Sequence, residues 1–201
     1  IVEMTVEIED WPLKRPFRIA YHTFESSRLI RVELRDGDLV GRGEGGEHPQ
    51  LEPLEAGRAA IMALAPRIEA GLGTAELLEP MGRGPARNAL DCALWDLACK
   101  RANRRLWELE GLPAPRPMRT AYTIGIAPLP EMIEDALAMR DYTLLKLKVD
   151  GSSGFEVLEA IAAARPDAEF IIDANEGWAP SQLEAFIARI ADYPVRLIEQ
   201  P

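Results

Sequence analysis

The second half of the sequence alternates short apolar runs with segments of helical period, and this alternation constrains the fold more than any other feature. The apolar runs have the length and the content of β-branched, leucine and aromatic residues that suit buried strands. Strands that are joined through helices lie parallel in one sheet. We predict strands at 120–126, 144–149, 169–173 and 195–199, and helices at 130–140, 155–164 and 181–190, with Ser181 as the N-cap of the last helix.

The first part of the sequence has a different pattern of hydrophobicity. Residues 1–9 and 28–34 alternate in hydrophobicity, and Asp36-Gly37 is a strong turn signal before Leu39-Val40. These features predict an antiparallel meander. Residues 16–27 are expected to form a loop that is too long for a tight hairpin, and such loops are often functional.

Two segments of this first part have helical period, at 55–69 and 85–103. A proline-rich stretch at 111–117 follows them and marks the change to strand and helix alternation. The sequence therefore predicts two domains, 1–115 and 116–201.

Composition limits the classes of function. The chain has 201 residues, a 47% hydrophobic content and a formal net charge of −10, which suit a globular protein without a nucleic-acid or anionic-membrane surface. No apolar run reaches the length of a membrane span and no signal peptide opens the chain, so we expect a cytoplasmic location.

Three glycines match a dinucleotide-binding pattern. Gly41, Gly43 and Gly46 satisfy G-x-G-x-x-G after a predicted strand. Pro49 and Pro53 interrupt the place where the phosphate-binding helix would begin, and no strand-helix-strand unit surrounds the motif. We therefore reject a dinucleotide site and interpret the segment as a glycine-rich turn.

Two lysines lie on the same face of an apolar strand. Side chains two residues apart in a strand point the same way, so Lys146 and Lys148 project together while Leu145, Leu147 and Val149 take the other face. Two ammonium groups on the inward face of a strand are unfavourable unless they have an anionic partner or a catalytic role there. This pair is the first indication of a site.

Two carboxylates end the next apolar runs. Asp173 follows Phe170-Ile171-Ile172, and Glu199 follows Leu197-Ile198. The carboxyl ends of the strands carry the functional groups of a β/α barrel. Paired carboxylates are hard oxygen ligands suited to Mg²⁺.

Lysine beside such a metal can act as a base, because burial and neighbouring positive charge favour the neutral amine. We assign that role to Lys148, which is nearer the rim of the barrel. Lys146 is one inward step deeper and could hold a substrate carboxylate or damp the charge of an enolate. The alternative is a set of solvated lysines and surface acids.

These motifs resemble those of a known superfamily. Lys-x-Lys at 146–148, Asp-Ala-Asn at 173–175 and Glu-Gln-Pro at 199–201 are similar to the muconate-lactonizing subgroup of the enolase superfamily, whose sites combine a lysine or histidine base with Mg²⁺. The first region resembles that superfamily's capping domain, including Gly41-Arg42-Gly43-Glu44 and the segment 89–97. Residues 123–126, 146–148 and 173–178 look most like the dipeptide epimerases of the L-Ala-D/L-Glu epimerase type.

The resemblance implies an α+β capping domain followed by a (β/α) TIM-type barrel, of which only the first four strands are present. It also implies Mg²⁺-dependent epimerisation of dipeptides by α-proton abstraction and reprotonation through a metal-stabilised enediolate, and a homo-oligomer in the complete form. The implied site has Lys148 and Lys146 as catalytic residues, Asp173 and Glu199 as metal ligands, Asn175 beside them, and Thr123, Arg18 and Phe24 as substrate contacts.

Two departures from the family pattern lead to further expectations. The sequence stops at Pro201, before the strands that carry the family's third metal ligand, opposing lysine and ammonium-binding acids, so we expect these 201 residues alone to be inactive. Phe24 stands where members that act on Ala-Glu usually carry a basic residue. Arg18 or Arg28 could replace it, or the substrate could have an apolar or cationic side chain, since Glu25 and Glu47 are near in sequence.

Several reactions on the same scaffold remain alternatives. o-Succinylbenzoate synthase, N-succinylamino acid racemase and muconate cycloisomerase use similar lysines and acids. A non-catalytic fragment that docks a partner is a further alternative of a different class.

Overall fold

The structure is a computed structural model that describes residues 2–48, 50–77, 80–151 and 153–201. Its contacts group into two compact units. One contains the chain up to Pro12 together with Ser26–Arg116, and the other contains Leu13–Glu25 and Pro117–Pro201. This grouping rests on contacts alone, so the division into domains 1–115 and 116–201 stays a prediction.

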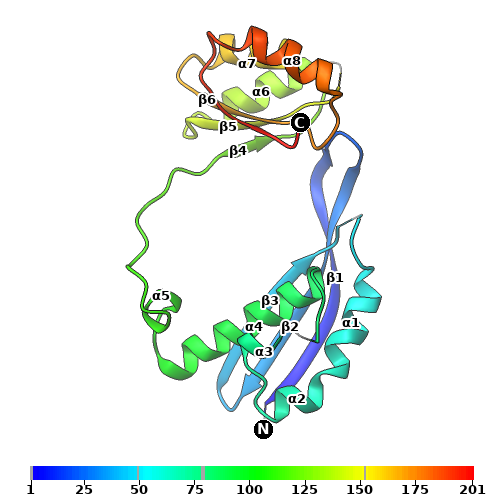
Figure 1. The fold of residues 1–201 in the computed structure, drawn as a ribbon, viewed down its shortest axis with the longest axis vertical. Coiled ribbons are helices and arrows are strands. Elements are labelled where there is room, and N and C mark those ends of the chain that lie inside the picture. The colour runs from blue at the N-terminus through cyan, green and yellow to red at the C-terminus, as the bar shows by residue number, and fades with distance from the viewer. Residues whose placement is uncertain (1, 49, 78–79, 152) are drawn as a thin grey trace. The chain divides into compact units, whose positions relative to one another are not determined.

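A three-stranded sheet, in the order β1-β2-β3, has most of its residues in the first unit, and only the ends of β1 and β2 at their hairpin tip group with the second (Figure 1). The strands are β1 (Glu3–Arg18), β2 (Thr23–Asp36) and β3 (Leu39–Gly46). β2 and β3 are antiparallel and place Val32 opposite Gly43. The predicted meander is confirmed in this pair.

The prediction of a long loop at 16–27 is wrong. β1 continues to Arg18 and β2 begins at Thr23, so only 19–22 connect them, and the Ile19 amide donates to the His22 carbonyl at 2.9 Å. Most residues of this tip are exposed. Sequence pattern identifies a strand by a buried apolar face, and an exposed hairpin lacks that signal.

Five helices in the described part of the first unit follow the sheet: α1 (Leu54–Ala63), α2 (Ala65–Glu69), α3 (Thr74–Leu77), α4 (Pro85–Ala102) and α5 (Leu106–Leu109). The predicted helix at 55–69 is divided in two at Leu64. Pro66 explains the break, because proline has no N–H to donate within a continuous helix but fits a first turn. The core of this unit contains Ile30, Val32, Leu34 and Leu90.

Glycines in β3 allow α4 to approach the sheet. Gly41, Gly43 and Gly45 are buried, and a Cβ on Gly43 would lie 2.0 Å from the Ala89 carbonyl oxygen of α4. The glycine-rich turn predicted here is therefore wrong: the glycines belong to a strand and are needed for helix packing. Pro49, used above to exclude a dinucleotide site, lies outside the described residues.

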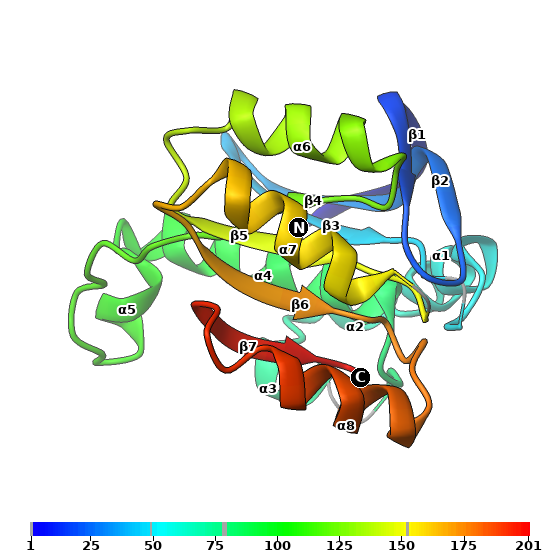
Figure 2. The same cartoon turned by 90° about the horizontal axis from the view of Figure 1, so that it is seen from above.

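Strand and helix alternate throughout the rest of the second unit, as predicted. The strands β4 (Tyr122–Ile124), β5 (Leu144–Lys148), β6 (Glu169–Asp173) and β7 (Val195–Glu199) are parallel and adjacent in that order. The helices α6 (Leu129–Ala138), α7 (Gly154–Ala164) and α8 (Pro180–Arg189) lie on one side of this sheet (Figures 1 and 2). The predicted fold class is confirmed: a capping domain of strands and helices precedes four parallel strands of a barrel type.

Burial in this sheet follows the predicted alternation. Leu145, Leu147 and Val149 are almost fully buried, together with Phe170 and Ile172 of β6. They pack with apolar side chains of the helices, which leaves the opposite face to the polar residues. Ser181 is not the N-cap of α8: the helix begins one residue earlier, after Ala179, whose amide donates to Gln182 Oε1 at 2.7 Å.

The tip of the β1–β2 hairpin contacts the start of this sheet. The Ile126 amide donates to the Arg18 carbonyl at 3.0 Å, and Arg15 binds Asp135 of α6 through a hydrogen bond of 2.6 Å. The Phe17 ring lies against Gly125, where a Cβ would come within 3.1 Å of it. These contacts explain why Leu13–Glu25 groups with the second unit. In the described part of the chain, no helix is long and apolar enough to cross a membrane.

Candidate active site

Three charged residues lie level with one another at the carboxyl end of the sheet. Lys148 of β5 is in register with Asp173 of β6, and Asp173 is in register with Glu199 of β7. Each is the last residue of its strand. Because register neighbours in a parallel sheet share a face, the three side chains project from the side that the helices do not cover.

Asp173 is the centre of this group. Its carboxylate is only 1% exposed, and its Oδ2 lies 2.8 Å from Lys146 Nζ and 2.7 Å from Lys148 Nζ. Its Oδ1 accepts a hydrogen bond of 3.0 Å from the Asn175 amide. Burial would raise the pKa of Asp173, but the hydrogen bonds from the two lysines outweigh burial, so the pKa lies below its ordinary value.

Lys146 joins the two carboxylates. Its Nζ lies 2.8 Å from Asp173 Oδ2 and 2.8 Å from Glu199 Oε2. Burial would lower the pKa of this ammonium group, but the hydrogen bonds to Asp173 and Glu199 prevail and raise it. Lys146, Lys148, Asp173 and Glu199 thus form one group of alternating charges, which we call the polar cluster.

The two lysines differ in exposure. Lys148 is buried, with 11% of its side chain exposed, whereas Lys146 has 21% exposed. Lys148 has a second partner, Asn175 Oδ1, at 2.9 Å. Each lysine therefore has two partners, and Lys148 is the more buried of the two.

The structure also joins Asn175 to two residues that the sequence did not suggest as site residues. Asn175 Nδ2 donates to Gln200 Oε1 at 3.3 Å, and Gln200 Nε2 donates to Glu176 Oε1 at 3.3 Å. Asn175, Glu176 and Gln200 all have left-handed backbone angles, with φ of 45°, 63° and 42°. Their positions in the loops after β6 and β7 were the only sequence signal, and that signal does not predict their contacts.

Of the three predicted substrate contacts, Thr123 is next to the polar cluster, whereas Arg18 and Phe24 belong to the β1–β2 hairpin. Thr123 is half-buried on β4, in register with Lys146. Arg18 is exposed at the end of β1. Phe24 packs edge-on against His22, with ring centroids 4.4 Å apart, and its centroid is 6.5 Å from that of Phe17. Among the described residues, no side-chain hydrogen bond or ion pair joins any of these three to the polar cluster.

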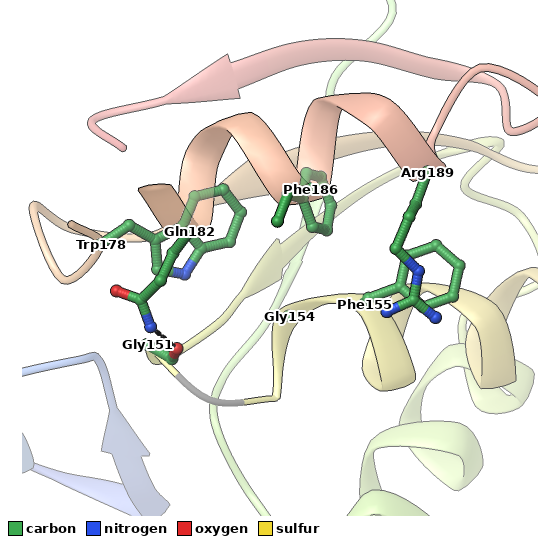
Figure 3. A pocket seen from close by; sticks show the side chains of 8 residues that line it. Gly151, Gly154, Phe155, Trp178, Gln182, Phe186 and Arg189 are labelled. Atoms are coloured by element: carbon green, nitrogen blue, oxygen red, sulfur yellow. Dashed lines mark hydrogen bonds between the residues drawn. The ribbon is translucent and has the colours of Figure 1, made fainter. Parts of the chain in front are cut away.

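A pocket of about 180 Å³ lies between α7 and α8 (Figure 3). Its aromatic lining includes Phe155, Phe186 and Trp178, and the Arg189 guanidinium lies 3.4 Å from the centre of the Phe155 ring. Trp178 Nε1 donates to the Asp150 carbonyl at 2.9 Å. This hydrogen bond joins the loops after β5 and β6, and the lining of the pocket contains no member of the polar cluster.

Asp173 and Glu199 have the chemistry of a site for a hard divalent cation. Both are carboxylates, and their oxygens already converge on one positive charge, the Lys146 ammonium. Where the structure describes the chain, no group of three or more histidine, cysteine, aspartate or glutamate residues is placed to hold a metal. The two carboxylates therefore fit part of a Mg²⁺ coordination shell.

Comparison with known proteins agrees with this geometry. Residues 1–111 match the family described as mandelate racemase / muconate lactonizing enzyme, N-terminal domain, and residues 129–201 match enolase C-terminal domain-like sequences. The chain belongs to the mandelate racemase and muconate lactonizing enzyme family of the enolase superfamily.

Its relatives include dipeptide epimerases. The chain is 40% identical to the L-Ala-D/L-Glu epimerase of Escherichia coli over 96% of its own length and 61% of that protein's. An enolase family member from Agrobacterium tumefaciens with homology to dipeptide epimerases, solved with sodium and L-Ala-L-Glu, is 36% identical and superposes with a TM-score of 0.93 over 100% of this chain and 62% of that one.

A third relative was solved with a metal and a different dipeptide. The dipeptide epimerase of Methylococcus capsulatus, in complex with Mg and L-Arg-D-Lys, is 30% identical, with a TM-score of 0.86 over 99% of this chain and 60% of that one. The chain thus spans about three fifths of the length of the relatives it matches.

Proposed function

We propose that the complete polypeptide containing this chain is a Mg²⁺-dependent dipeptide epimerase. The observation that carries the proposal is the polar cluster, in which a buried lysine and two carboxylates meet at the carboxyl ends of three adjacent parallel strands. The similarity to dipeptide epimerases supports the choice of substrate class.

Lys148 is the residue that removes or returns the α-proton. A general base needs a nitrogen lone pair in its neutral form and a fixed direction toward the substrate. The contacts with Asp173 and Asn175 hold the Lys148 amine at the edge of the sheet. Lys146 is placed beside the carboxylates, where its positive charge stabilises negative charge that develops on the substrate.

Asp173 and Glu199 would hold the metal through their carboxylate oxygens. A bound Mg²⁺ supplies the positive charge that makes ionisation of a carbon acid next to a carboxylate feasible. The other residues of the site would lie in the remainder of the polypeptide, which the relatives possess and this chain does not contain.

We infer a side-chain preference of the enzyme from the residues of the hairpin tip. Phe24 forms an aromatic surface with His22 and Phe17. Arg28 is already bound to Glu47 at 2.8 Å and to Glu55 at 3.1 Å, so its charge is compensated. We therefore expect a substrate with an apolar or cationic side chain unless Arg18 binds the carboxylate of a glutamate.

The test is incorporation of deuterium from D₂O at the Cα atoms of a dipeptide library by the complete polypeptide with Mg²⁺. We expect exchange with epimerisation on some dipeptides and its loss in the Lys148→Ala variant. If no dipeptide exchanges, or if Lys148→Ala exchanges normally, the proposal is wrong. A strong preference for Ala-Glu would reject only the expected apolar or cationic side chain.

A further inference from the structure

The hydrogen bonds that leave Lys148 toward the surface have a single direction. The Lys148 ammonium donates to Asn175 Oδ1, Asn175 Nδ2 donates to Gln200 Oε1, and Gln200 Nε2 donates to Glu176 Oε1. We call Asn175, Gln200 and Glu176 the amide relay. An ammonium group has no acceptor atom and an ionised carboxylate has no donor, so the two ends of the relay impose the same direction on both amides.

We propose that Gln200 and Glu176 are positioning residues for catalysis, because they orient the Asn175 amide so that its oxygen faces Lys148. This inference rests on the proposed function of Lys148. Neither residue touches the lysine. Glu176 fixes which end of the Gln200 amide faces it, and Gln200 in turn fixes the Asn175 amide.

The relay matters because it limits where Lys148 can direct a proton. An ammonium nitrogen carries three hydrogens in a tetrahedral arrangement. Asp173 Oδ2 accepts one of them at 2.7 Å and Asn175 Oδ1 accepts another at 2.9 Å. The third hydrogen is thereby directed away from both, and it is the one available for exchange with a substrate. If the Asn175 side-chain amide rotated by about 180°, its NH₂ group would face the Lys148 ammonium. The third hydrogen of Lys148 would then no longer have a fixed direction.

The backbone supports the same residues. Among the described non-glycine residues, positive φ occurs at Asn103, which ends α4, and at the three members of the relay. Left-handed backbone at non-glycine residues is unfavourable and is retained mainly where surrounding structure or function requires it. The Glu176 amide also donates to the Gln200 carbonyl at 2.7 Å, which keeps the two side chains adjacent.

The experiment compares variants of the complete polypeptide with Mg²⁺, using a dipeptide that the wild type epimerises. We expect Gln200→Ala and Glu176→Gln each to lower kcat about tenfold, the lower end of the range for residues that orient a catalytic group, with little change in KM. Gln200 and Glu176 are exposed, so we expect both variants to keep the wild-type Tm. Glu184→Gln is the matched control, because it makes the same chemical change at an exposed glutamate of α8 and should keep the wild-type kcat.

A double-mutant cycle separates positioning from a general structural role. If Gln200 acts through Asn175, the tenfold effect of Gln200→Ala must disappear when Asn175 is already alanine. An active wild type whose kcat is unchanged by Gln200→Ala and Glu176→Gln overturns this inference alone. Independent, multiplying effects of Gln200→Ala and Asn175→Ala also overturn it. A wild type that exchanges no α-proton overturns the proposed function and this inference together.

Discussion

Lys148 and Asp173 occupy the same register position on adjacent parallel strands, and Lys148 Nζ lies 2.7 Å from Asp173 Oδ2. The same oxygen accepts from Lys146 at 2.8 Å. One buried carboxylate therefore compensates two ammonium groups. Because a buried ion pair is far less stable when one partner is removed, the cluster depends on Asp173 more than on any other member.

Asp173→Asn should lower the free energy of unfolding by about 3 kcal/mol, since it leaves the two lysines with only Glu199 as an anionic partner. Urea unfolding of the complete polypeptide in EDTA measures this effect without a contribution from metal binding. Adding Lys146→Met to Asp173→Asn should recover part of the loss. An Asp173→Asn variant as stable as the wild type would contradict the central role of this carboxylate.

Removal of metal should lower the Tm of the complete wild-type polypeptide and abolish deuterium exchange, because a ligand that binds only the folded state stabilises it. Saturating Mg²⁺ should restore both. Glu199→Gln should weaken the response of Tm to Mg²⁺ without large loss of stability in EDTA, since 37% of its side chain is exposed. A Glu199→Gln variant with wild-type Mg²⁺ affinity would exclude this residue as a ligand.

Gly43→Ala should destabilise the first unit by about 3 kcal/mol, because its Cβ would lie 2.0 Å from the Ala89 carbonyl oxygen and force α4 away from β3. Gly46→Ala is the matched control in the same strand. Apart from Gly46 and its two chain neighbours, no atom of the described structure lies within 4 Å of a Cβ at Gly46, so the effect of Gly46→Ala should stay below about 1 kcal/mol. Thermal unfolding of both variants measures these effects. A much larger loss of stability in Gly43→Ala than in Gly46→Ala supports helix packing as the reason for glycine in β3, whereas equal effects would contradict it.

Arg165→Lys should lower the free energy of unfolding by about 3 kcal/mol. Arg165 is 2% exposed, and its guanidinium donates to the carbonyls of Ala136 at 2.6 Å and Tyr142 at 2.8 Å. A lysine cannot reach these acceptors together, so buried carbonyl groups lose their partners. Arg189→Lys, at an exposed arginine of α8, should change stability much less, and equal losses in the two variants would contradict the explanation.

Asp167 should make stability depend on pH in the acid range. Hydrogen bonds from Arg165 lower the pKa of its carboxyl group from the ordinary 3.8 to about 2. A carboxyl group whose pKa is lower in the folded state stabilises the fold when it is ionised in both states. This contribution is present above about pH 4 and is lost as the pH falls toward 2.

The difference in unfolding free energy between wild type and Asp167→Asn measures this effect apart from other acids. We expect the difference to be constant above about pH 4 and to shrink between pH 4 and 2. Solvent screens the half-exposed carboxylate, so the effect is modest. A difference that stays constant down to pH 2 would contradict the lowered pKa.

Sequence pattern was sufficient for the parts of the fold in which burial has a regular period. The apolar runs before Asp173 and Glu199, and the alternation around Lys146 and Lys148, led to the sheet and to the polar cluster. The hairpin tip was misjudged because the ends of β1 and β2 at the tip are mostly exposed. The one-turn helices α3 and α5 are too short to show a period.

The amide relay could not have been predicted from spacing. Gln200 and Glu176 follow the ends of different strands, and their contact depends on the loop backbone at positive φ, which a sequence of non-glycine residues does not indicate. The glycines of β3 matched a phosphate-binding pattern for an unrelated reason. Helix α4 lies so close to the strand that only glycine fits at Gly41, Gly43 and Gly45. This packing is visible in the structure and not in the sequence.

The contacts of the hairpin tip also set an order of events during synthesis. Arg15 and Asp135 are separated by 120 positions in the chain, and Arg18 is similarly far from Ile126. During translation, the tip therefore leaves the ribosome before Ile126 and Asp135 have been synthesised. Contacts of such long range form late, because the intervening chain must first lose its freedom. The tip stays exposed to solvent until β4 and α6 have been synthesised, and Phe17 of the tip lacks its contact with Gly125 until then.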